Sequence, residues 1–131
     1  VGANAPVIWP MHPRTISRLA SHKIILPPEI RSIEPVSYLD MLALEAGARV
    51  ILTDSGGIQK EASWAGIPCV TMRNETEWVE TVDRGDNVLT GADPARIVSG
   101  ADKMRARGPK APASPGTRAS GIIAGIILEG R

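Results

Sequence analysis

A pair of glycines separates an apolar, strand-like run from a helical pattern, and this unit constrains the fold most. Residues 49–53 read Arg-Val-Ile-Leu-Thr and predict a buried strand, because β-branched residues surround an apolar centre. The turn 54–57, Asp-Ser-Gly-Gly, follows, and residues 58–65 predict a helix that stops at Gly66. A strand that leads through glycines into a helix is typical of open parallel sheets, where ligands bind beyond the carboxyl ends of the strands.

Strands and helices alternate along most of the chain. The helix start at Asp93 and Pro94 is the clearest, with a capping Asp before a first-turn Pro. The alternation predicts an α/β fold, a Rossmann-like parallel sheet with helices on both faces. The predicted strands are 6–10, 23–26, 49–53, 67–72 and 87–90, and the predicted helices are 14–20, 35–46, 58–65, 77–83 and 94–106.

The length of 131 residues suits one domain. We divide it into a partial nucleotide-binding domain, 1–106, and a Gly- and Pro-rich linker with a short terminal helix, 107–131. The chain has no initiator Met and opens close to a strand-like run, so we expect a fragment or a truncated reading frame.

Composition argues against several classes of partner. The net charge of +1 points to neither nucleic acid nor a membrane surface. The longest strongly apolar stretch, 122–128, is far too short to span a bilayer, and no signal peptide is visible. The single cysteine, Cys69, excludes an internal disulfide and fits a reducing cytoplasm; its apolar neighbours predict that it is a small buried residue.

The glycine turn has the chemistry of a phosphate site. A helix N-terminus offers unpaired N–H groups and a partial positive charge. Gly56 and Gly57 let the ligand approach the backbone, and Ser55 adds a hydroxyl donor. The alternative is an ordinary strand-to-helix turn in which Ser55 only caps the helix.

Further polar residues flank this turn. Glu61 lies one helical turn beyond Gly57, where a carboxylate could accept from the two hydroxyls of a ribose. His12 follows the first predicted strand, on the same rim as Ser55, and could donate to a phosphate or a leaving group. The polar segment 73–77 also lies on this rim and either lines a sugar pocket or is solvated. For Glu61 and His12 the alternative is an ordinary surface residue.

Four ordered segments together resemble one family, the non-hydrolysing UDP-N-acetylglucosamine 2-epimerases. The resemblance covers roughly residues 5–100. It rests on residues 7–15 with their His-Pro-Arg-Thr turn, on 34–42, similar to Glu-Pro-Leu-x-Tyr-Leu-Asp-Phe-Leu, on 51–61, similar to Ile-Leu-Thr-Asp-Ser-Gly-Gly-Ile-Gln-Glu-Glu, and on 66–68 with 72–77.

The resemblance implies a GT-B-like fold, in which two Rossmann-like domains enclose the active site and this chain matches most of the second. It implies that His12 is the catalytic residue of this chain, near the diphosphate and the reacting sugar. The implied contacts with the UDP-sugar are Ser55, Gly56 and Gly57 to the diphosphate, Glu61 to the ribose, Val36 and Met41 to uracil, and Arg73 and Trp78 elsewhere on the ligand.

The implied reaction inverts C2 of UDP-N-acetylglucosamine to give UDP-N-acetylmannosamine, by elimination and re-addition of UDP. It needs no cofactor or metal and serves cell-surface polysaccharide biosynthesis. Helix N–H groups, Ser55 and His12 would stabilise the departing diphosphate. The carboxylate base comes, in the family, from the N-terminal domain. We therefore expect this chain to be inactive alone, to need that missing domain or a partner chain, and, as family members often do, to form homodimers.

Two departures from the family pattern carry consequences. The first strand of the domain, which lies centrally in a doubly wound sheet, is not matched, so we expect a gap between neighbouring strands. Trp78 stands where the family often has Arg, and this form is similar to relatives that act on modified UDP-sugars such as a diacetamido-uronate. The exact sugar therefore stays open. Two other interpretations are a split module of a GT-B glycosyltransferase-like complex and a non-functional gene remnant.

Overall fold

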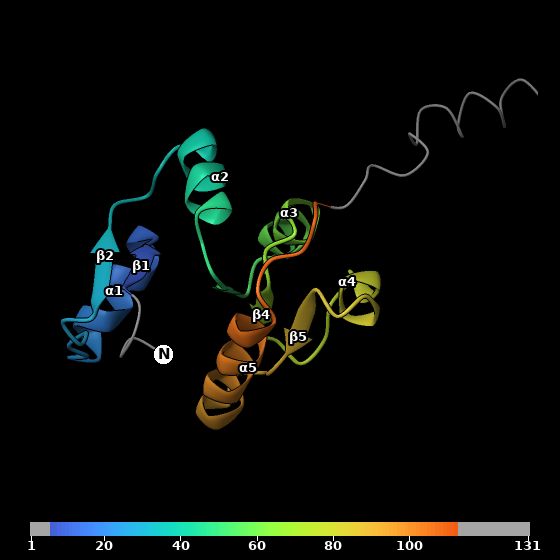
Figure 1. Ribbon diagram of the computed structural model, residues 1–131. Coiled ribbons are helices and arrows are strands. Elements are labelled where there is room, and N and C mark those ends of the chain that lie inside the picture. Colours follow the sequence, from blue (N-terminus) through green and yellow to red (C-terminus); the bar gives the residue numbers. More distant parts are fainter. Residues whose placement is uncertain (1–5, 113–131) are drawn as a thin grey trace, which may run out of the picture.

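The computed structural model describes residues 6–112, and over this range five strands alternate with five helices (Figure 1). The short terminal helix predicted after the Gly- and Pro-rich linker, at residues 119–128, lies outside the described residues. The elements are β1 (Val7–Pro10), α1 (Pro13–Ser21), β2 (Ile30–Ile33), α2 (Tyr38–Ala46), β3 (Ile51–Thr53), α3 (Gly56–Ala65), β4 (Cys69–Thr71), α4 (Val79–Asp83), β5 (Asn87–Leu89) and α5 (Pro94–Arg107).

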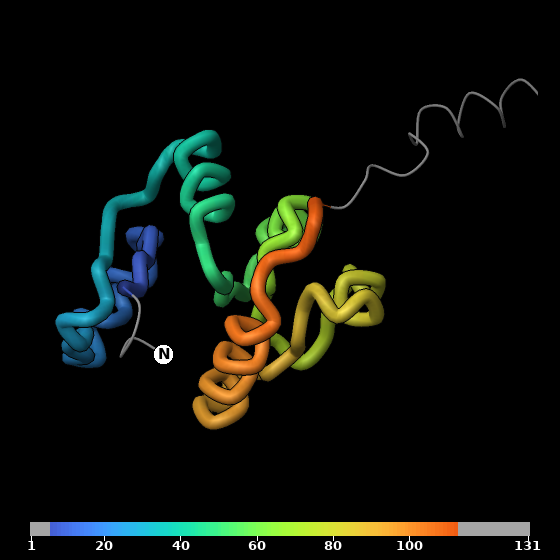
Figure 2. The backbone as a smooth tube through the Cα atoms, in the orientation of Figure 1, coloured from blue at the N-terminus to red at the C-terminus, as the bar shows by residue number. Residues whose placement is uncertain are grey.

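The strands form two parallel sheets. β1 pairs with β2, and β3, β4 and β5 pair in that order. Within residues 6–112 no ladder joins β1 or β2 to β3. Figures 1 and 2 show the β1–α1–β2 unit standing beside the larger sheet, with α2 leading from one to the other. The predicted parallel pairing is confirmed, and the expected gap between neighbouring strands lies, within the described residues, between the β1–β2 pair and the larger sheet.

Helices cover both faces of the larger sheet. Successive side chains of a strand point to opposite faces, so neighbouring residues of β4 contact different helices. On one face Val70 of β4 packs with Ala101 and Met104 of α5 in the core. On the other face Thr71 donates to the side chain of Asn87 at 2.8 Å, next to α3 and α4. The prediction of helices on both faces is confirmed for this sheet.

Helix ends follow the signals in the sequence. The side chain of Asp93 accepts from the backbone N–H of Arg96 at 2.8 Å and begins α5. Gly66 ends α3 in the left-handed conformation, with φ 75°. α2 begins at Tyr38 rather than Pro35, because the side chain of Ser37 provides its cap.

The strand predicted at 23–26 is wrong. The chain there has no regular structure, Lys23 has φ 53°, and Ile25 is 91% exposed. The strand forms instead at β2, after the turn in which the N–H of Ile30 donates to Pro27. The apolar run 23–26, which precedes two prolines, resembles a strand in sequence. The segment that pairs with β1, however, is β2.

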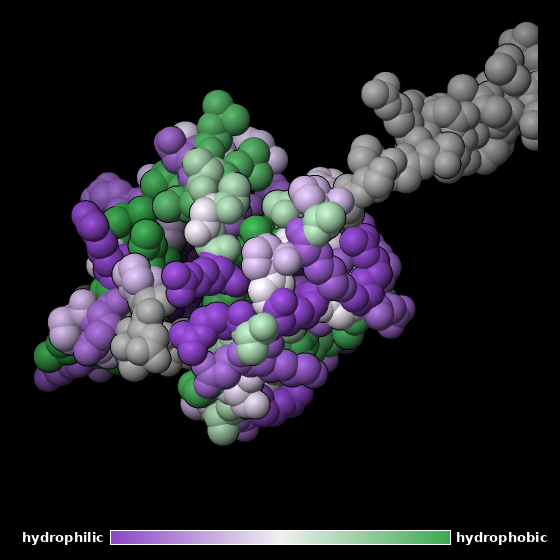
Figure 3. Space-filling model, viewed as in Figure 1, coloured by the Kyte–Doolittle hydropathy of each residue, from purple (hydrophilic) through white to green (hydrophobic). Residues whose placement is uncertain are grey.

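The apolar residues that recur at helical spacing in α2, Leu39, Leu42, Ala43 and Ala46, are exposed or half-buried rather than buried. Leu39 is 75% exposed, and the one buried residue of α2 is Glu45. Figure 3 shows hydrophobic surface over this helix. The predicted helix is thus present, but its packed face is the one that carries Glu45 and meets α3.

Candidate functional site

The candidate site begins where β3 runs into α3. Ser55 is the residue before the helix, but its side chain makes no capping hydrogen bond. The first backbone bond of α3 runs from Gln59 to Ser55, and the hydrogen bonds among the described residues give the N–H groups of Gly56, Gly57 and Ile58 no acceptor. The helix therefore presents free donors at the carboxyl end of β3, the arrangement that binds anions.

The two glycines differ in their surroundings. A Cβ on Gly57 would meet only the Oγ of Ser55, at 3.8 Å, so the backbone here is open to a ligand. A Cβ on Gly56 would clash with the carboxylate of Glu77 and lie 3.5 Å from Nε1 of Trp78. The segment that covers Gly56 thus leaves no room for a side chain there. No described residue imposes a glycine at Gly57.

The segment after β4 is fixed over α3 by a buried polar network. Gln59 is fully buried and accepts from Thr76 at 2.6 Å and from Asn87 at 3.3 Å. Thr76 also accepts from the backbone N–H of Trp78 at 3.0 Å. The network joins the first turn of α3 to the segment carrying Arg73 and Trp78, and it anchors this segment at Thr76 and Trp78.

Arg73 and Trp78, both predicted site residues, lie on this segment. The guanidinium of Arg73 donates to Glu77 at 3.1 Å. Lys60 lies over the Trp78 ring, 4.5 Å from its centroid, and forms an ion pair with Glu80. Nε1 of Trp78 is buried and has no hydrogen-bond partner within the described chain.

Glu61 belongs to a group of acidic side chains between α2 and α3. A hydrogen bond with Glu61 raises the pKa of Tyr38, with the Glu61 charge adding to it. Glu45 is buried, and first its burial and then Glu61 raise its pKa to about 7. Both oxygens of Glu45 lack a partner among the described residues. Glu61 therefore lies beside the hydroxyl of Tyr38 and the carboxyl of Glu45, and the raised pKa of Glu45 favours the neutral form of that carboxyl.

Val36 and Met41, the predicted uracil contacts, lie just before α2 and within its first turns, and both are half-buried. α2 packs on α3, the helix that carries Glu61. His12 lies elsewhere, in the β1–β2 unit, where it begins α1 and its Nδ1 accepts from the N–H of Arg14 at 3.1 Å. No described hydrogen bond or ion pair connects His12 with the glycine turn.

Sequence reasoning missed Tyr38, Glu45 and Gln59 as neighbours of the site. A signal was available for the first two, since Tyr38, Met41 and Glu45 follow i, i+3, i+7 and so share one face of α2. Gln59 gave no such signal, because its partners are distant in sequence. Cys69 is buried as predicted, and burial raises the pKa of its thiol to about 12.

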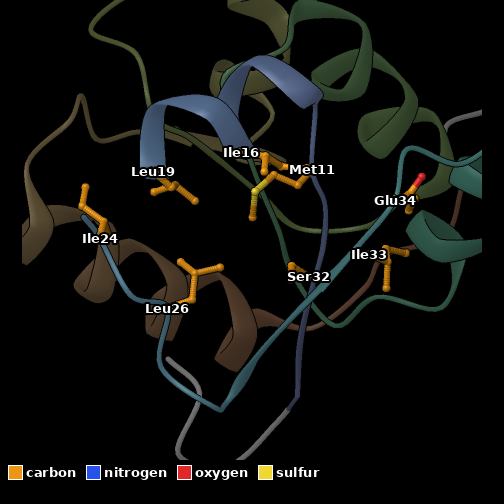
Figure 4. A pocket seen from close by; sticks show the side chains of 8 residues that line it. All are labelled: Met11, Ile16, Leu19, Ile24, Leu26, Ser32, Ile33 and Glu34. Atoms are coloured by element: carbon orange, nitrogen blue, oxygen red, sulfur yellow. The ribbon is translucent and has the colours of Figure 1, made fainter. Parts of the chain in front are cut away.

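A separate hollow of about 440 Å³ lies in the β1–α1–β2 unit (Figure 4). Its lining offers only one hydroxyl and one carboxylate among apolar side chains, and we assign it no ligand. The lining residues are Met11, Ile16, Leu19, Ile24, Leu26, Ser32, Ile33 and Glu34. Residues 6–112 contain no group of three or more His, Cys, Asp or Glu side chains that could hold a metal ion, and no helix among them is long and apolar enough to cross a membrane.

Comparison with known proteins places these features in a family. The family model for UDP-N-acetylglucosamine 2-epimerase matches residues 2–120. A UDP-2,3-diacetamido-2,3-dideoxy-D-glucuronate 2-epimerase from Pseudomonas aeruginosa is 52% identical over 97 residues, 74% of this chain and 27% of the relative. A UDP-N-acetylglucosamine 2-epimerase from Methanococcus maripaludis is 46% identical over 102 residues, 75% of this chain and 28% of the relative.

A solved structure shows the same likeness in three dimensions. The crystal structure of Methanocaldococcus jannaschii UDP-GlcNAc 2-epimerase in complex with UDP-GlcNAc and UDP is similar to this chain with a TM-score of 0.78 and 37% identity. The match covers 95% of this chain and 36% of that protein. The chain therefore spans about a third or less of the length of these relatives.

Proposed function

Because the chain belongs to the UDP-N-acetylglucosamine 2-epimerase family, we propose that its 131 residues form the UDP-sugar-binding part of a sugar-nucleotide 2-epimerase. The reaction is the conversion of UDP-N-acetylglucosamine to UDP-N-acetylmannosamine, by elimination and re-addition of UDP. The same assignment implies a cytoplasmic, homodimeric enzyme that supplies activated sugars for cell-surface polysaccharides.

The observation that carries the proposal is the set of free donors at the N-terminus of α3. Free N–H groups, an unengaged Ser55 hydroxyl and the open backbone at Gly57 meet at the carboxyl end of β3. A diphosphate there would accept from these donors and gain from the helix dipole. Arg73, on the neighbouring segment, supplies a full positive charge beside the same turn.

With the diphosphate at the N-terminus of α3, the ribose and uracil would lie toward Glu61 and α2. Glu61 lies on the next turn of α3, so its carboxylate is the acceptor for the ribose hydroxyls. Tyr38 and Glu45 beside it, whose pKa values are both raised, limit the acidic charge gathered at this point. Val36 and Met41, at the start of α2, then supply a half-buried apolar surface for uracil.

A second candidate substrate is favoured by one residue and one relative. Trp78 and Lys60 form a cation–π pair beside the diphosphate turn. The Pseudomonas aeruginosa relative that is 52% identical is named for a UDP-diacetamido-glucuronate. A uronate carries an additional carboxylate, which Lys60 or Arg73 could pair with. We keep UDP-N-acetylglucosamine first, and direct competition between the two UDP-sugars for the same protein decides the order.

In the reaction the described residues stabilise the leaving group, UDP. UDP departs as an anion, and preorganised N–H groups and Ser55 stabilise the charge that develops on it. His12 is the proton donor or hydrogen-bond donor to the departing oxygen once ligand joins the two units. The base that removes the C2 proton is supplied from outside these 131 residues.

Calorimetric titration of wild type and Glu61→Ala with UDP and with inorganic diphosphate tests the assignment. We expect Glu61→Ala to weaken UDP binding about tenfold, as for a lost charge-assisted pair of hydrogen bonds. Binding of diphosphate should be unchanged, because it has no ribose. Asp102→Asn, an exposed carboxylate on α5, is the matched charge control. Equal losses for both ligands, or none for UDP, would remove Glu61 from the ribose site.

A further inference from the structure

A carboxylate already lies against the first residue of α3. A Cβ built on Gly56 would clash with Oε1 of Glu77 and lie 3.2 Å from its carboxyl carbon. Gly56 begins the helix, so this carboxylate lies at the end where the N–H groups are free and the dipole favours negative charge. The unpartnered Nε1–H of Trp78 lies beside the same point. Glu77 thus lies beside the free N–H groups, without accepting a hydrogen bond from them, in surroundings suited to an anion.

Two sets of contacts hold Glu77 there and leave it able to move. Its Oε2 accepts from Arg73 at 3.1 Å. The backbone one residue earlier is anchored, since Thr76 donates to buried Gln59. The side chain of Glu77 itself is 51% exposed, so it can rotate into solvent while the backbone stays in place.

We propose that Glu77 is an internal stand-in for phosphate, which an entering nucleoside diphosphate must displace. The proposal rests on the proposed function and adds a selectivity device to it. A carboxylate and a phosphate oxygen repel each other at one helix end. When Glu77 rotates away, Arg73 loses its carboxylate partner and becomes free to pair with the phosphate. A multiply charged diphosphate displaces Glu77, whereas a singly charged anion gains too little.

The test is titration of the full chain and of Glu77→Gln with UDP, inorganic diphosphate and uridine. Glu77→Gln keeps the shape of the side chain and removes its charge. We expect it to bind UDP and diphosphate about threefold to fivefold more tightly than wild type, the range set by one charge at a helix end. Uridine affinity should not change, and the gain should shrink at high ionic strength. Asp83→Asn, on α4, is the charge-matched control and should match wild type.

The outcomes separate the two proposals. If UDP binds wild type but Glu77→Gln binds it equally or more weakly, the role of Glu77 is overturned and UDP binding stands. If UDP binds neither protein while diphosphate binds Glu77→Gln more tightly, the nucleotide assignment falls and the role of Glu77 stands. If neither ligand binds either protein, both proposals fall.

Discussion

The carboxyl group of Glu45 is buried next to Glu61, where α2 packs on α3. Burial, and then the charge of Glu61, raise the pKa of Glu45 from 4.5 to about 7. The folded state therefore holds a proton that the unfolded state has released between about pH 4.5 and 7. In this window the free energy of unfolding falls as pH rises. The stabilisation that comes from the proton on Glu45 is fully present only below about pH 4.5.

Glu45→Gln should be more stable than wild type at pH 8 by about 1–2 kcal/mol, because the buried group no longer has to ionise. The difference should vanish at pH 4, where Glu45 is neutral in both states. Urea unfolding followed by circular dichroism at pH 4, 6 and 8 measures it. Glu29→Gln, at an exposed position, is the matched control. A stability advantage that is the same at all three pH values would contradict the raised pKa.

Asp86 should show the opposite dependence on pH. Burial alone would raise the pKa of this carboxyl. Hydrogen bonds from Arg107, at 2.9 Å, and Lys110, at 3.2 Å, together with Arg84 and Ser63, outweigh burial, so the pKa of Asp86 is lower than normal. The stabilisation is thus present above the ordinary Asp pKa of 3.8 and is lost as pH falls through the lower folded value.

Asp86→Asn should cost about 2 kcal/mol at pH 7, since it removes a buried charge that joins α3, α5 and the segment before β5. Asp102→Asn removes an exposed pair with Arg105 and should cost less than about 0.5 kcal/mol. Chemical unfolding at pH 7 compares the two variants. Equal, small losses would show that the ion pairs of Asp86 contribute no more than surface pairs do.

The purified 131-residue chain should not exchange the C2 proton of UDP-N-acetylglucosamine. The carboxylates around the turn have other partners: Glu77 pairs with Arg73, and Glu80 with Lys60. Glu61 is assigned to the ribose. Proton abstraction needs a positioned base and a closed site.

Incubation in deuterated water followed by mass spectrometry or NMR of the sugar measures this exchange. Deuterium at C2 above the level of His12→Ala and Glu61→Ala would place the base within this chain. Exchange that begins only when an N-terminal epimerase domain is added would support a site shared between two parts.

The sequence predicts the local features of this fold well and the non-local ones poorly. Asp93 with Pro94 and the stop at Gly66 act within one helical turn, and both helix ends lie where they were expected. The strand expected in the apolar run 23–26 forms instead at β2, whose sequence Ile-Arg-Ser-Ile is less apolar but which pairs with β1. Local pattern cannot show which run finds a partner.

The same division applies to the site. The turn at Gly57 is visible in sequence because strand, glycines and helix are contiguous. The contact of Glu77 with Gly56 and the burial of Gln59 join residues that are about twenty positions apart, so only the folded chain reveals them. Whether His12 reaches the diphosphate remains a prediction, since the two sheets carry no ladder between them within the described range.

The most direct test of the central claim is calorimetric titration of UDP into wild type and Gly57→Val. A Cβ added at Gly57 would meet only Ser55 Oγ, at 3.8 Å, so the variant should fold while its methyl groups fill the space for phosphate. Gly47→Val, at the end of α2, is the control for adding the same side chain elsewhere. We predict that UDP binds wild type and Gly47→Val alike, and Gly57→Val at least about tenfold more weakly, a loss of about 1.4 kcal/mol or more. Equal affinity of folded Gly57→Val and wild type for UDP would contradict the account.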